Sequence, residues 1–194
     1  MVRDLFIDTT NNCILLIYEE DNIIIDTYFE NNLTKVSDIV NQKIDDLLEK
    51  NKTRLRDINN FFVVKGPGTF TGVKVGITVA KTCKMLNNNI RIFLISSLQL
   101  MSGIKATMAV LDARSNKSYV GVYIDGKPYF PDQVLDNNML EDFYSNCKNI
   151  LKNIKYVKNY DSILLVENFK SIKHLLNEIE NIDLLVPLYI KQYT

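Results

Sequence analysis

Short apolar runs separated by polar turns dominate the first half of the chain. Runs of roughly four to eight β-branched, aromatic and aliphatic residues are typical of strands. Turns as short as Glu19-Glu20-Asp21-Asn22 favour an antiparallel meander of the first three runs. The strands expected up to residue 95 are 5–7, 13–18, 23–29, 61–64 and 90–95.

A longer segment after the third run has helical spacing. We expect a helix that is capped by Asn32 or Thr34 and ends near Lys50, because its apolar residues recur at helical intervals and its charged residues lie mostly opposite them. The apolar face consists of Leu33, Val36, Val40, Ile44 and Leu47.

A second helix is expected at 70–86, after a cap at Thr69, and it is a crossover between parallel strands. Gly72, Gly76 and Ala80 recur four residues apart, so they form a stripe that lets another backbone come close. Val75, Val79 and Leu86 are expected on one side of this helix, and Phe70, Val73 and Ile77 on the other. Both sides cannot face one sheet, and we expect the side of Val75 to meet a partner helix.

The second half of the chain begins as the first does. Apolar runs at 108–111 and 119–124 flank a polar turn that follows Asp112, as another turn follows Asp8. Either the two halves are pseudo-duplicated lobes in which Asp8 and Asp112 are equivalent, or they hold unrelated hairpins with aspartates in their turns. Further on, the sequence predicts a loop bounded by Pro128 and Pro131, a helix at 139–147, a strand at 163–166 and a helix at 171–179, with Ser96 capping a short segment before them.

Composition and charge restrict the classes of partner. The chain has 194 residues, a formal net charge of zero and a pI of about 6.6. Because no basic excess is present, we expect only weak, salt-labile binding of tRNA by the chain alone. The widely spaced Cys13, Cys83 and Cys147 are expected to be free thiols in a reducing cytosol. Without a signal peptide or an apolar run near ~20 residues, the sequence predicts a cytoplasmic protein with no membrane contact.

Few residues are candidates for chemistry. The one histidine, His174, has no second ligand nearby, which argues against a metal site and a catalytic triad. Asp8 and Asp112 are candidates for a magnesium–phosphate cleft, but no glycine follows them, which favours plain turn residues. Gly66-Pro67-Gly68 is either a tight strand-to-helix turn or a phosphate cradle. Arg114 is either an anion contact or a solvated turn charge. We predict no catalytic and no metal-ligating residue.

One stretch also resembles a known family. GPGTFTGVKVGITVAK at 66–81 is similar to the GPGSFTGxRxGxxxAKG motif of the TsaB (YeaZ) proteins, with Gly66, Pro67, Gly68, Gly72 and Gly76 as its structural positions. Residues 111–123 resemble the family's IDAR…VYxGxY segment, and 186–191 resemble its P-x-Y-[LI]-[RK] close.

The resemblance implies a fold. Together with the strand order βββαβα, it implies an α/β, actin-like/Hsp70-like (ASKHA) fold with two lobes. Each lobe is expected to be a mixed sheet with helices, and the second is reduced. The expected lobes are 1–103 and a smaller C-terminal lobe, 104–194, whose last helix packs back on the first lobe.

The resemblance also implies a function. A TsaB-type chain would be a non-catalytic scaffold, an inactive homologue of a threonylcarbamoyltransferase, that binds TsaD. TsaD adds the threonylcarbamoyl group to adenosine 37 of ANN-decoding tRNAs, and TsaE joins the complex. The chain alone would form a homodimer, and tRNA would be reached only through the complex. No cofactor is expected, with a nucleotide at the heterodimer interface left open. The expected partner-interface residues are Val36, Val40, Leu47, Thr71, Val75 and Val79.

Two rival functions stay open. The first is an actin-like-fold ATPase or small-molecule kinase that uses Asp8, Asp112 and the turn at 66–68. The second is a stand-alone homodimeric binding module. The glycine-free turns after the two aspartates disfavour the first rival.

Overall fold

The computed structural model describes residues 1–158, 160 and 162–190, and it divides the chain into two compact units. Unit 1 comprises Met1–Ile95 with Leu176–Pro187, and unit 2 comprises Ser96–Leu175 with residues 188–190. The boundary expected after residue 103 is therefore wrong. Helix α3 (Ser97–Ser102) belongs to unit 2, because it packs on the strands and the last helix of that unit.

Unit 1 is built on a five-stranded mixed sheet in the order β3-β2-β1-β4-β5. The first three strands form the expected antiparallel meander, and β1, β4 and β5 run parallel. All five expected strands are confirmed, within a few residues at their ends. They are β1 (Arg3–Asp8), β2 (Ile14–Glu20), β3 (Ile23–Glu30), β4 (Asn60–Val64) and β5 (Arg91–Ile95).

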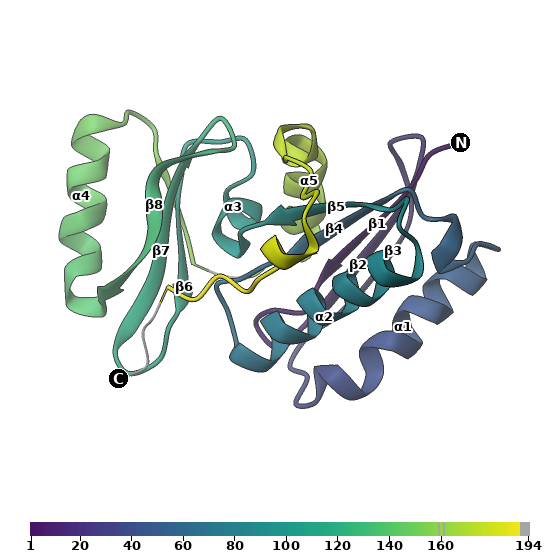
Figure 1. Cartoon of the computed structure of the whole chain (residues 1–194). Helices are drawn as coiled ribbons and strands as arrows, with labels where there is room; N and C mark the ends of the chain where they lie inside the picture. Colours follow the sequence, from purple (N-terminus) through teal and green to yellow (C-terminus); the bar gives the residue numbers. More distant parts are fainter. Residues whose placement is uncertain (159, 161, 191–194) are drawn as a thin grey trace. The chain divides into compact units, whose positions relative to one another are not determined.

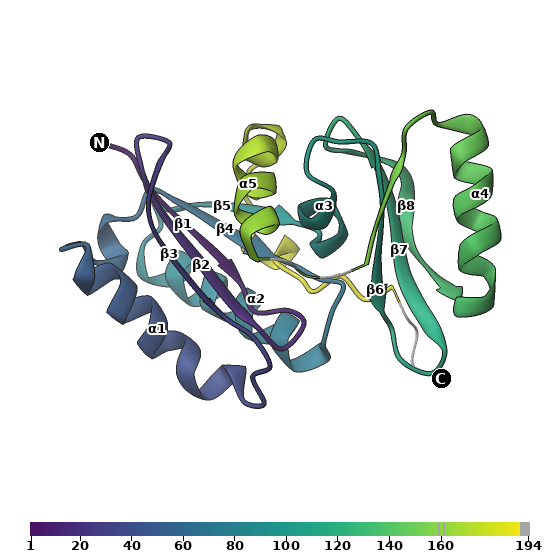
Figure 2. The ribbon, with the colours of Figure 1, turned by 180° about the vertical axis from the view of Figure 1, so that it is seen from behind.

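Two helices cover one face of this sheet (Figures 1 and 2). Helix α1 (Val36–Lys50) follows β3, and helix α2 (Phe70–Leu86) connects β4 to β5, with the short 3-10 turn η1 (Leu55–Asp57) between the two helices. The N-cap of α1 is Lys35 rather than the expected Asn32 or Thr34. Thr69 is the N-cap of α2, but its side chain makes no capping hydrogen bond. The core of unit 1 fills the space between these helices and the sheet.

Unit 2 repeats this plan on a smaller scale. Its four-stranded sheet has the order β8-β7-β6-β9, with β6 antiparallel to β7 and parallel to β9. Helix α4 lies on one face of the sheet and α3 on the other (Figures 1 and 2). The elements are β6 (Thr107–Asp112), β7 (Lys117–Ile124), β8 (Lys127–Asp136), β9 (Lys155–Val157), α4 (Leu140–Ile150) and α5 (Ser162–Ile172), with 3-10 turns η2 (Asn137–Met139) and η3 (Lys173–Leu175).

Three expectations for unit 2 are wrong. The loop expected between Pro128 and Pro131 is strand β8, which accepts prolines because it lies at the edge of the sheet and pairs irregularly with β7. The strand expected at 163–166 lies inside helix α5, since a short apolar run fits a buried helix as well. The helix expected at 171–179 is helical only as far as residue 175, through the end of α5 and the turn η3.

Residues Leu176–Pro187 return to unit 1 as a mostly irregular segment, not as the expected last helix. The N–H of Ile179 donates to the carbonyl of Ile92 at 2.8 Å, and Glu178 forms an isolated bridge with Phe93. The Arg91 guanidinium binds the Glu178 carboxylate at 2.6 Å. These contacts cover the exposed edge of β5. The segment also contains the 3-10 turn η4 (Ile182–Leu184). Lys191, the last residue of the family-like close, lies outside the described residues.

The same strand order in both units confirms the expected duplication, and with it the actin-like (ASKHA) fold with a reduced second lobe. In each sheet a meander of three strands is followed by a strand parallel to the first. Asp8 ends β1 and Asp112 ends β6, and each carboxylate accepts the backbone N–H two residues further on, from Thr10 and from Arg114, both at 2.8 Å. The two aspartates are therefore structural equivalents that shape the same kind of turn.

None of the helices that the structure describes is long and apolar enough to cross a membrane.

The small-residue stripe of α2 packs on the turn that follows β1. A methyl group at Gly72 would lie 2.1 Å from the carbonyl oxygen of Thr9, and one at Gly76 would lie 2.8 Å from Thr9 Oγ1. One at Gly68 would lie 2.8 Å from the Cβ of Thr10. The Thr9 hydroxyl donates to the Gly72 carbonyl at 2.7 Å. Gly72 is therefore needed for a backbone-to-backbone contact within unit 1, and Gly68 and Gly76 for close contacts with the side chains of Thr10 and Thr9.

We predict that Gly72→Ala destabilises the protein. Helix propensity alone favours alanine by up to about 1 kcal/mol, but overpacking costs about 1–3 kcal/mol, and the contacted Thr9 carbonyl belongs to the backbone and cannot rotate away. Thermal melts should therefore show a lower melting temperature for Gly72→Ala. Gly76→Val should shift it in the same direction.

The matched control is Thr78→Ala, on the exposed side of the same helix. It should change the melting temperature little. An unchanged or raised melting temperature for Gly72→Ala would show that α2 does not press on the β1 turn.

Candidate functional site

The outer surfaces of α1 and α2 enclose a shallow groove of about 310 Å³, called the α1–α2 groove below. Helix α1 contributes Ser37, Val40 and Asn41. Helix α2 contributes Phe70, Thr71, Lys74, Val75, Thr78 and Val79. The lining combines valines, an aromatic ring, hydroxyls and one lysine, and it holds no carboxylate. Such a lining suits contact with another protein surface better than chemistry.

Phe70 is the largest apolar side chain of the groove and is 49% exposed. The Lys74 ammonium lies 4.0 Å from the centre of its ring, a cation–π contact that holds the ring in place. The expectation that Phe70 shares a side with Val73 and Ile77 is wrong. Those two residues are buried in the unit, whereas Phe70 lines the groove together with Val75.

The expected interface residues divide into two groups. Val40, Thr71, Val75 and Val79 line the α1–α2 groove. Val36 and Leu47 are buried in the core of unit 1, because the apolar face of α1 packs mainly on its own sheet. Leu86, placed on the side of Val75, is exposed at the end of α2 but does not line the groove.

Sequence reasoning missed Phe70, Lys74 and Thr78. These residues form an i, i+4 row beside the row of Thr71, Val75 and Val79, and both rows lie on one face of α2. Helical spacing alone could have grouped them, but the apolar character of Phe70 suggested a buried position. The contribution of α1, through Ser37 and Asn41, depends on how the two helices pack and carries no sequence signal.

An ion pair anchors the C-terminal end of α1 to the sheet. The Lys50 ammonium lies 2.7 Å from the Asp26 carboxylate of β3, and the Asn51 amide donates to the same carboxylate at 3.1 Å. Partial burial by itself raises the pKa of Asp26. Hydrogen bonds from Lys50, Asn51 and the N–H of Thr27 outweigh burial and hold that pKa below its ordinary value. The carboxylate therefore helps to hold α1 in the position that forms the groove.

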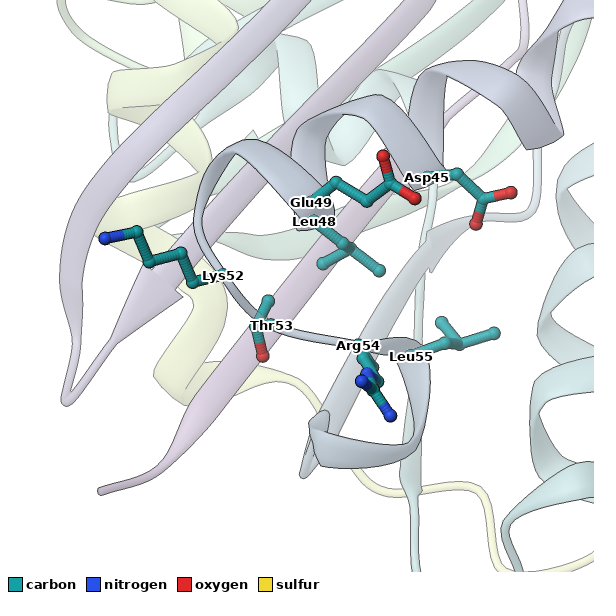
Figure 3. Close-up of a pocket in the computed structure, with 7 residues that line it drawn as sticks. All are labelled: Asp45, Leu48, Glu49, Lys52, Thr53, Arg54 and Leu55. Atoms are coloured by element: carbon teal, nitrogen blue, oxygen red, sulfur yellow. The ribbon is translucent and has the colours of Figure 1, made fainter.

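A second hollow, of about 470 Å³, lies where α1 ends and the chain turns towards η1 (Figure 3). Asp45 and Glu49 project from α1, and Arg54 lies on the segment that follows (Figure 3). With Lys52, the lining holds two cations and two carboxylates. Since the charges balance, the hollow favours neither an anion nor a cation. The described residues contain no group of three metal-ligating side chains.

The Asp8 turn does not fit the magnesium–phosphate group of actin-like ATPases. Asp8, Thr9 and Thr10 are fully buried, and the Asp8 carboxylate accepts the N–H of Thr10. The Thr9 hydroxyl and the Gly72 backbone occupy the space beside the turn. A phosphate needs free backbone N–H groups and room at such a turn. At the Asp8 turn the Thr10 N–H is bonded and the space is filled, so no step of a phosphoryl transfer can be derived from this turn.

The remaining candidates stand apart from the groove. Arg114 is exposed in the Asp112 turn with φ near 59°, and its role as an anion contact stays a prediction. His174 is exposed on η3. Gly66 and Pro67 lie at the end of β4 and join it to α2. Cys13, Cys83 and Cys147 are buried free thiols, and burial raises their pKa values, to about 12 for Cys83, so they stay protonated at neutral pH.

Comparison with known proteins gives a consistent set of relatives. A family model described as "TsaD: tRNA N6-adenosine threonylcarbamoyltransferase" matches residues 34–137, more than half of the chain. An uncharacterised protein of Mycoplasma pneumoniae is 31% identical over 142 residues, which are 68% of this chain and 71% of that protein. The tRNA threonylcarbamoyladenosine biosynthesis protein TsaB of Bacillus subtilis is 30% identical over 154 residues, 74% of this chain and 65% of that protein.

The fold matches a solved structure as well. YeaZ from Pseudomonas aeruginosa superposes with a TM-score of 0.73 at 16% sequence identity, over 97% of this chain and 100% of that chain. At this identity the likeness concerns the fold alone, and the fold is that of both units described above.

We predict that Asp26→Asn loosens α1 in a pH-dependent manner. Because the Asp26 pKa is lower in the folded protein than in the unfolded chain, its carboxylate stabilises the fold above about pH 4. That contribution is lost as pH falls through the folded pKa. The variant should lose up to about 1 kcal/mol of unfolding free energy at pH 7, the range for an ion pair with one exposed partner.

Denaturant titrations at several pH values measure this difference. Wild type and Asp26→Asn should converge as the pH drops below about 4. Lys50→Gln should reproduce most of the loss at pH 7. Two stability curves that run parallel at every pH would contradict the assigned role of the Asp26 carboxylate.

Proposed function

The chain belongs to the TsaB (YeaZ) family, and on that premise we propose that it serves tRNA threonylcarbamoyladenosine biosynthesis as a non-catalytic subunit that binds TsaD. The observation that carries the proposal is the α1–α2 groove, which is lined by Phe70, and the side chain of Phe70 is 49% exposed. Half-exposed aromatic rings set among valines are common at the centres of protein–protein interfaces. TsaD is the partner that family membership favours.

The chemistry of the described residues supports a role without catalysis. The Asp8 turn is filled by Thr9 and by the backbone of Gly72. The three thiols are buried and protonated. The lone histidine, His174, is exposed on η3, and none of the hydrogen bonds given for the described residues joins it to a carboxylate. An activity of the complex would therefore reside in TsaD. This chain would position and stabilise its partner, with TsaE as a further member.

We predict that Val75→Glu weakens association with TsaD by more than a hundredfold. An unpaired carboxylate in an apolar interface costs about several kcal/mol, and each ~1.4 kcal/mol is tenfold in affinity. Thr71→Glu should act in the same direction. Thr71 is fully outside the core, so this second variant separates lost binding from lost folding. Co-purification with the TsaD of the same organism and calorimetric titration measure both.

The matched control is Ile23→Glu, which adds the same charge at an exposed apolar residue of β3. It should bind TsaD like the wild type. Thermal melts of all three variants check folding. If the two groove variants bind TsaD normally, the groove is not the interface. If the wild type fails to bind TsaD at all, the proposed function itself is wrong.

The alternative is an actin-like-fold ATPase or small-molecule kinase. We predict that the isolated chain neither hydrolyses Mg-ATP nor transfers its phosphate, because the Asp8 turn offers no room for a phosphate. Phosphate release over hours and isothermal titration with Mg-ATP measure this. Turnover that disappears in Asp8→Asn would establish the alternative, and Asp112→Asn, in the equivalent turn, serves as the comparison.

A further inference from the structure

Lysines and tyrosines gather where α4 ends and the chain enters β9. From Phe143 to Tyr160 the sequence contains four lysines and no aspartate or glutamate. In a chain whose net charge is zero, this is a strongly uneven distribution. We call the group of Tyr144, Lys148, Lys152, Lys155, Tyr156 and Lys158 the lysine–tyrosine cluster.

Ring contacts and a hydrogen bond connect members of the cluster. The rings of Tyr144 and Tyr156 meet edge to face, with centres 5.2 Å apart. The Lys148 ammonium lies 5.5 Å from the centre of the Tyr144 ring, one helical turn away. The Tyr144 hydroxyl donates to the carbonyl of Ile154 at 3.1 Å, which fixes the turn between α4 and β9. Lys152 lies in this turn and is exposed.

The cluster faces solvent at a sheet edge. Strand β9 is the last strand of its sheet, and Tyr156 pairs in register with Met108, which places it on the face that α4 covers. Tyr156 is nonetheless 38% exposed, and Lys148, Lys152, Lys155 and Lys158 are all exposed. The acidic residues of α4, Glu141 and Asp142, lie in its first turn, roughly 10 Å along the axis from Lys148. No salt bridge recorded among the described residues involves a cluster lysine.

We propose that the lysine–tyrosine cluster binds single-stranded RNA. Lysines that follow a backbone of phosphates supply affinity that depends on salt, and an exposed aromatic ring supplies a face on which a base stacks. The phosphates of a lipid surface would also satisfy the lysines, and the vesicle measurement below separates that partner from RNA. The inference does not rest on the proposed function, because it concerns unit 2 and the chain alone.

The cluster also refines an expectation drawn from the sequence. Zero net charge predicts weak, salt-labile RNA binding. Four exposed lysines between residues 148 and 158 give such weak binding a location. With about four phosphate contacts on a single strand, the logarithm of the affinity should fall with the logarithm of the salt concentration at a slope of about −3.

The test is fluorescence anisotropy with a labelled, unstructured RNA of roughly 12 nucleotides, titrated with the full chain between about 50 and 200 mM salt. Replacing Lys148, Lys152, Lys155 and Lys158 together by serine should weaken binding at least tenfold and flatten the salt slope. The matched control replaces four exposed lysines elsewhere by serine and should change affinity less than about twofold. These are Lys35, Lys52, Lys127 and Lys170.

Tyr156→Ala should weaken RNA binding about tenfold, and Tyr156→Phe should restore it, because stacking needs the ring and not the hydroxyl. Thermal melts show whether each variant is folded. Equal losses in the two lysine sets, an unchanged affinity in Tyr156→Ala, or equal binding of a fully duplex RNA would overturn the proposal. So would tighter binding to vesicles with about 30% phosphatidylserine, since the partner would then be a lipid surface.

Discussion

The contact between the N-terminal half of α2 and the turn after β1 is the constraint on which the first unit depends. The Thr9 hydroxyl donates to the Gly72 carbonyl, and the Thr9 carbonyl lies where a Cβ of residue 72 would stand. A helix can approach a strand end this closely only if its facing residues lack side chains. The four-residue spacing of Gly68, Gly72 and Gly76 is thereby explained by packing alone, without a ligand.

This contact also decides which face of α2 is left for a partner. The small-residue stripe, Val73 and Ile77 face the sheet. The rows that contain Thr71 and Phe70 therefore face outward beside α1. The Asp26–Lys50 pair ties the C-terminal end of α1 to β3, on the helix that forms the other wall of the groove.

Sequence patterns predicted the strands of unit 1 and both of its helices, because a buried sheet and an amphipathic helix impose their periods directly. They failed where tertiary packing decides. Residues 163–166 form part of a helix despite their apolar run, and prolines 128 and 131 lie in an edge strand. The groove was half predicted: Thr71, Val75 and Val79 follow from spacing, whereas Phe70 was assigned to the wrong side because an aromatic residue is more often buried.

The two units share one topology but differ in what their equivalent turns allow. Helix α5 follows β9 as α2 follows β4, yet α5 contains no glycine and cannot press on the Asp112 turn as α2 presses on the Asp8 turn. Asp112 is accordingly exposed, and Arg114, two residues further on, has a positive φ. Asp8, by contrast, is fully buried. The two units therefore share a backbone plan, and the glycines of α2 distinguish the closed Asp8 turn from the open Asp112 turn.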